Sequence, residues 1–131
     1  MSQHPNPRLW RWLALGWGAA TLMWLGLEDT SSLPVSLLGI SGALLTILRP
    51  SFALLIHKPW VWPVLGATGG ALATVLTTVL MFFKNAWHAH PFPDYPTGML
   101  LAMLERLPWW ALAGGLLGLA LRLWRSPIQD D

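Results

Sequence analysis

Four apolar stretches, separated by short polar segments, constrain this 131-residue chain more than any other feature. A helix needs about 20 apolar residues to cross the hydrocarbon core of a bilayer, at 1.5 Å per residue. We expect helices over residues 9–27, 33–56 with a kink near Pro50, 60–83 and 108–124. The sequence therefore predicts an all-α integral membrane protein, with four transmembrane helices in a single domain over residues 1–131.

The composition agrees with a membrane protein. Hydrophobic residues make up 54% of the chain and charged residues 11%, against about 25% charged in an average soluble domain. This number of charged residues is too small to cover the surface of a soluble protein. The remaining apolar surface is therefore expected to face lipid. The absence of cysteine excludes disulfides and thiolate metal sites, and no run of Lys and Arg indicates nucleic-acid binding.

The positive charges predict an orientation. With four crossings both termini share one side of the membrane. Of the eight Lys and Arg residues, only Lys84 and Arg106 are expected on the other side. The positive-inside rule then places the N- and C-termini in the cytoplasm, with the chain in the inner or plasma membrane. Nine of the ten tryptophans fall at the predicted boundaries, as in an aromatic belt, and only Trp17 falls at mid-depth.

Residues 84–107 form the one segment with chemically specific side chains, and we expect it to be an extracytoplasmic loop. Its second part, 97–107, is too short to span and is expected to be a helix in the membrane interface. Its three prolines favour polyproline II geometry, which would present Phe92 and Tyr95 as a rigid aromatic surface for a partner. The alternative is a stiff connector without a partner.

Two histidines in this loop suggest a metal site. Residues two apart point the same way in an extended segment, and Pro91 disfavours a helical conformation at His90. His88 and His90, with Asp94 nearby, could then form a partial site for zinc or copper. The alternative is that both histidines bond to loop carbonyls, and the His-x-His spacing alone does not distinguish the two.

Small residues recur at spacings of three and four along three of the expected helices. Such stripes let the backbones of membrane helices approach closely, within one chain or between subunits. The residues expected to serve helix packing are Gly16, Ala20, Gly66, Gly70, Thr74, Thr77, Gly114 and Gly118.

Several functions are disfavoured because no Asp, Glu, Lys, Arg or His lies well inside the expected spans. Proton-coupled transporters and bis-histidine haem proteins need such groups at depth, and motifs of hydrolases or phosphate-binding loops are missing. We expect a non-catalytic accessory or assembly subunit that binds lipid and other membrane subunits or itself. The alternatives are a homo-oligomeric transporter or channel along the third helix, and copper or zinc handling through His88 and His90.

Overall fold

A computed structural model describes residues 6–28, 30–49, 58–88 and 91–125. This part of the chain is helical and contains no strand, which confirms the predicted all-α class. The helices are α1 (Pro7–Leu25), α2 (Ser32–Ile47), α3 (Val61–His88), α4 (Thr97–Glu105) and α5 (Leu107–Arg125).

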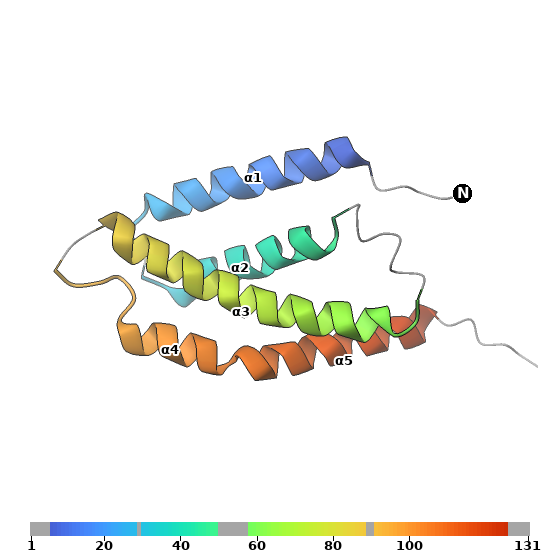
Figure 1. Cartoon of the computed structure of the whole chain (residues 1–131). Coiled ribbons are helices and arrows are strands. Elements are labelled where there is room, and N and C mark those ends of the chain that lie inside the picture. Colours follow the sequence, from blue (N-terminus) through green and yellow to red (C-terminus); the bar gives the residue numbers. More distant parts are fainter. Residues whose placement is uncertain (1–5, 29, 50–57, 89–90, 126–131) are drawn as a thin grey trace, which may run out of the picture.

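The helices lie side by side as an antiparallel bundle with α3 at its centre (Figure 1). α2 and α5 pack along α3, whereas α1 packs mainly on α2. The start of α1 and the end of α5 lie at the same end of the bundle, which we call the terminal end. The opposite end, where α3 finishes and α4 begins, is the loop end.

The second helix is shorter than predicted. The sequence suggested a kinked helix continuing to residue 56, but α2 finishes at Ile47. The physical reason is Pro50, because a proline disfavours helical geometry in the residue before it, here Arg49. The rest of the predicted helix, residues 50–56, lies outside the described part of the chain.

The third helix is longer than predicted, because residues 84–88 continue α3 instead of opening the loop. No glycine or proline interrupts this stretch, and the first proline beyond it is Pro91. His88 is therefore the last residue of a 28-residue helix, and the extended geometry expected around the two histidines does not apply to it.

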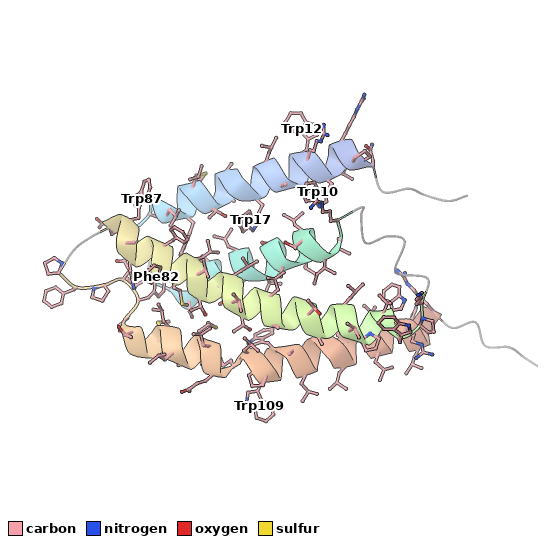
Figure 2. All side chains as sticks on the ribbon, in the orientation of Figure 1. Trp10, Trp12, Trp17, Phe82, Trp87 and Trp109 are labelled. Carbon is pink, nitrogen blue, oxygen red and sulfur yellow. The ribbon has the colours of Figure 1, made fainter. Side chains whose placement is uncertain are left out.

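The fourth helix lies differently from the prediction. Instead of lying across the end of the bundle, α4 runs along α3 and almost in line with α5 (Figure 1). Only Arg106 separates the two helices, because Pro108 has no N–H for the next helical hydrogen bond. Trp109 therefore lies midway along the bundle, as Figure 2 shows, and not at its outer boundary.

The predicted small residues of α3 and α5 face one another. A Cβ added to Gly66 would lie 2.0 Å from the carbonyl oxygen of Gly114, and one added to Gly70 would lie 1.9 Å from that of Trp110. A Cβ on Gly118 would likewise lie 2.2 Å from the carbonyl oxygen of Trp62. The two helices thus touch backbone to backbone, which only glycine permits at these positions.

The contact between α2 and α3 is also close. A Cβ on Gly39 would lie 2.0 Å from Oγ1 of Thr77 and 2.8 Å from the carbonyl oxygen of Ala73. Thr77 donates its hydroxyl proton to that same Ala73 carbonyl over 2.8 Å. The small residues of α3 therefore serve packing inside the chain on two of its sides.

Two tryptophans attach α1 to α2. The indole Nε1 of Trp17 donates to the carbonyl oxygen of Leu38 over 2.9 Å, and that of Trp10 donates to Leu45 over 3.0 Å. The Trp17 ring also fills the space beside Gly42, where an added Cβ would lie 2.8 Å from it. α1 is thus anchored to α2 by these two indole rings.

We expect Trp17→Phe to lower the free energy of unfolding by about 1–3 kcal/mol, because the smaller phenyl ring loses both the hydrogen bond to Leu38 and part of the packing beside Gly42. Denaturant unfolding in detergent micelles measures this. Trp12→Phe is the matched control, since Trp12 is 72% exposed on the same helix and should be neutral. Equal effects of the two changes would mean that Trp17 does not anchor α1.

Candidate functional site

Two groups of polar side chains lie among the apolar helices. One group, at the loop end, ties residues 94–95 to the end of α3 and to the connection between α1 and α2. The other lines a small cavity midway along the bundle.

Asn85 and Tyr95 close the loop-end group. The Asn85 side chain donates from Nδ2 to the Tyr95 carbonyl oxygen over 2.7 Å and accepts from the Tyr95 backbone N–H over 2.9 Å. The Tyr95 hydroxyl donates to the carbonyl oxygen of Ser31 over 2.9 Å, across 64 residues of sequence. We call these three residues the latch, because they join three segments of the chain at one point.

A lysine lies beneath the latch. Lys84 is fully buried, and its Nζ lies 4.4 Å from the centroid of the Trp24 ring, which is itself 6.4 Å from the Tyr95 ring. An ammonium held over an indole in a desolvated site gains about 2 kcal/mol from the ring quadrupole. The sequence pattern predicted Lys84 to lie in the loop, although Lys84 continues the stripe of Thr77 and Met81 at helical spacing.

His88 and Asp94, two of the three predicted metal ligands, contact each other directly. His88 Nδ1 lies 2.5 Å from Asp94 Oδ2, and both side chains are largely shielded from solvent. Two ligands of one tetrahedral zinc, each about 2.1 Å from the metal, would lie more than about 3 Å apart. His90 lies outside the described residues, among which no three His, Asp or Glu side chains gather. Zinc or copper binding stays a prediction.

We expect Asp94→Asn to lower the free energy of unfolding by about 1–2 kcal/mol, because the hydrogen bond to His88 loses its charged acceptor. The loss should be the same with and without a metal chelator. A stability loss that appears only when zinc or copper is present, together with bound metal that disappears in His88→Ala/His90→Ala, would instead assign these residues to a metal.

The predicted aromatic surface is divided by the fold. Phe92 is 85% exposed, but Tyr95 is completely buried in the cluster with Trp24 and Met81. The expectation that Tyr95 faces a partner is therefore corrected, because its ring and hydroxyl are both used inside the chain. Of these two aromatic residues, only Phe92 lies on the surface.

The mid-bundle cavity has a volume of about 50 Å³ and is lined partly by polar groups. Thr74 and Thr77 donate their hydroxyl protons to carbonyls of the preceding turn, so their oxygens can still accept. Arg106, at the break between α4 and α5, lines the same cavity. The sequence placed Arg106 at the outer boundary, but the in-line arrangement of α4 and α5 brings it level with Thr74, near the middle of α3.

No catalytic arrangement emerges from the described residues. Their buried or half-buried threonine hydroxyls donate to carbonyls four residues earlier and not to a base: Thr21, Thr46, Thr74, Thr77 and Thr78. Hydroxyls bonded in this way stabilise their own helix and are not activated as nucleophiles. Both polar groups are thus suited to structure or to binding.

Comparisons of the chain with protein-family models, with curated proteins and with solved structures give no match. A function for this chain therefore rests on the geometry of its own residues.

Proposed function

We propose that the chain is a multi-pass integral membrane protein that serves as a non-catalytic accessory or assembly subunit of a membrane complex. Two segments of the described chain, Val61–His88 and Thr97–Arg125, are long and apolar enough to cross a membrane. The distribution of side chains supports this location: several threonines of α3 are buried, whereas large apolar residues such as Leu22 and Met23 are about 70% exposed.

In this proposal the membrane is crossed four times, by α1, α2, α3 and the α4–α5 pair. The terminal end faces the cytoplasm, where Arg49 lies 5.6 Å from the Trp10 ring centroid and Arg125 lies 4.7 Å from that of Trp62. Arginine and tryptophan both favour the head-group layer, so these pairs support a boundary at that end.

A single cysteine tests this orientation, because the natural chain has none. Gly98→Cys places a thiol near the start of α4, where an added Cβ meets nothing within 4 Å. An impermeant thiol reagent should label it in intact cells. Labelling only after the cells are broken open would reverse the orientation.

The observation that carries the proposed role is the open face of α1. A Cβ on Gly16 would meet nothing within 4 Å, and Ala20, one turn further along, is exposed as well. The glycines of α3 and α5 are used inside the chain, so this stripe is available to another helix. In a bilayer, small residues on an outward face let a partner helix approach closely.

Gly16→Ile tests the role in native membranes. We expect the variant to fold but to lose its larger assembly when the membranes are gently solubilised and separated on a native gel. Gly18→Ile is the matched control, because it is equally open but points away from Gly16 on the same helix. A parent protein that runs as a monomer and co-purifies with no other membrane protein would remove the basis of the proposal.

A small homo-oligomeric transporter or channel is a second candidate, and the mid-bundle cavity favours it. A basic residue at membrane depth often marks a substrate path, and Arg106 lines this cavity together with Thr74 and Thr77. A path further along α3 is closed, because Gly66 and Gly70 touch the backbone of α5. Chloride flux in liposomes that Arg106→Gln abolishes would support this candidate, and the absence of flux from the parent protein would exclude it for that ion.

A further inference from the structure

We propose that a groove between α2 and α5 binds one acyl chain of an anionic phospholipid, with the phosphate of that lipid at Arg125. This inference rests on the membrane location in the proposed function, but not on the accessory role.

The groove is large and almost entirely apolar. Its volume is about 580 Å³, within the range of about 300–1,000 Å³ that is typical of ligand pockets. Gly66, Gly69 and Gly70 of α3 line it, and aliphatic side chains of α2 and α5 stand beside them: Ile40, Leu44, Ile47, Leu117 and Leu121. The groove exists because α2 and α5 each pack on α3 but barely on one another.

Leaving a groove of this kind empty would cost free energy. The atoms that line it would lack packing partners on one side, and each lost contact forfeits dispersion energy. In the part of the chain that the structure describes, the glycines of α3 carry no side chain that could fill the space. In a bilayer, the molecules at hand to fill an apolar groove open to the side are lipid chains.

The length and charge of the groove select the lipid. Its lining residues on α5 run from Trp110 to Arg125, about 22 Å at 1.5 Å per residue, which exceeds the depth of about 15 Å of one leaflet. Among the described residues of the lining, Arg125 is the charged one; it lies at the terminal end, with its guanidinium 4.7 Å from the Trp62 ring centroid. A cation at the mouth of an apolar groove complements a lipid whose head group carries a negative charge.

Native mass spectrometry of the purified full chain in detergent tests this proposal with two probes, palmitoyl-oleoyl phosphatidylglycerol and palmitoyl-oleoyl phosphatidylcholine. The parent should bind one phosphatidylglycerol about fivefold more tightly than phosphatidylcholine, the factor that corresponds to about 1 kcal/mol for one arginine near the head group. Arg125→Gln should abolish this preference. Arg11→Gln, which removes the same charge from an exposed position on α1 outside the groove, should keep it.

A second set of variants fills the groove. Gly69→Leu places a side chain on the groove lining, where the nearest atom to an added Cβ is the flexible Cδ1 of Ile47 at 2.7 Å. It should weaken binding of both lipids at least tenfold. Ala113→Leu fills the groove from α5 and serves if Gly69→Leu does not fold, and Ala102→Leu, exposed on α4 outside the groove, is the matched control.

Several results would overturn the proposal: no bound lipid, equal binding of both lipids by the parent, unchanged binding by the groove-filling variants, or loss of head-group preference in Arg106→Gln but not in Arg125→Gln. Extraction of the membranes with alkaline carbonate separates this failure from that of the proposed function. A chain that resists extraction but binds no lipid is a membrane protein without this site, whereas a chain released by carbonate is not an integral membrane protein.

Discussion

Gly70→Ala should destabilise this protein by about 3 kcal/mol or more, although it adds a single methyl group. The new Cβ would lie 1.9 Å from the carbonyl oxygen of Trp110 and 2.5 Å from its carbonyl carbon. Backbone atoms cannot rotate aside as a side chain can, so α3 and α5 must separate along their whole contact. The cost should therefore reach or exceed the upper end of the range of about 1–3 kcal/mol that is usual for overpacking.

The measurement is the free energy of unfolding in mixed micelles, with Gly16→Ala as the matched control. Nothing lies within 4 Å of a Cβ at Gly16, so alanine there should be neutral or stabilise the helix by about 0.5–1 kcal/mol. Gly114→Ala should resemble Gly70→Ala, because its Cβ would lie 2.1 Å from the carbonyl oxygen of Gly66. If Gly70→Ala and Gly16→Ala proved equally stable, the backbone contact between α3 and α5 would be refuted.

Tyr95→Ala should cost about 3–5 kcal/mol, the usual effect of removing a fully buried aromatic ring. The ring packs against Trp24 and Met81 in the apolar core, and the hydroxyl donates a hydrogen bond to the carbonyl oxygen of Ser31. Losing both would release the connection between α3 and α4 from the end of the bundle. Hydrogen exchange of the residues around Ser31 should increase together with that of the connection.

Tyr95→Phe separates the two contributions, because it keeps the ring and removes the hydrogen bond to Ser31. We expect it to cost about 1 kcal/mol. Phe92→Ala is the control from the same loop and should change stability by less than about 0.5 kcal/mol, because Phe92 is 85% exposed. A Tyr95→Ala variant as stable as Phe92→Ala would show that the latch does not hold the loop.

The parts of the fold that follow from local sequence patterns were predictable. Apolar length gave four main helices, and Pro7 begins α1 as a first-turn proline, after an Asn6 side chain that accepts from the Arg8 backbone N–H over 3.0 Å. The spacing of small residues identified Gly66 and Gly114 as packing residues. It could not identify their partners, because the same stripe serves contacts within a chain and between chains.

The candidate sites were harder to predict, because they depend on contacts between distant residues. Polar residues near a proline-rich segment indicate a loop, and only the tertiary structure shows Lys84 beneath Trp24 or Tyr95 bonded to Ser31. The same holds for Arg106. Its charge and the nearby Pro108 suggested the end of a helix at the surface, whereas the collinear α4 and α5 bring it midway along the bundle.

The length of α3 has a consequence for the kind of bilayer that suits this protein. Its 28 residues measure about 42 Å, roughly 12 Å more than the thickness of an average hydrocarbon core. Tilting by the usual 20° or so shortens its vertical extent by only about 3 Å, so in the proposed membrane location at least one further turn would project beyond the acyl chains. In the proposed orientation the start of α3 lies at the cytoplasmic face, so the surplus would emerge on the opposite face and place Lys84 and Asn85 near the level of the lipid phosphates. A thinner membrane would leave this end of α3 beyond the head-group layer, and a thicker one would place it within the depth of the hydrocarbon core.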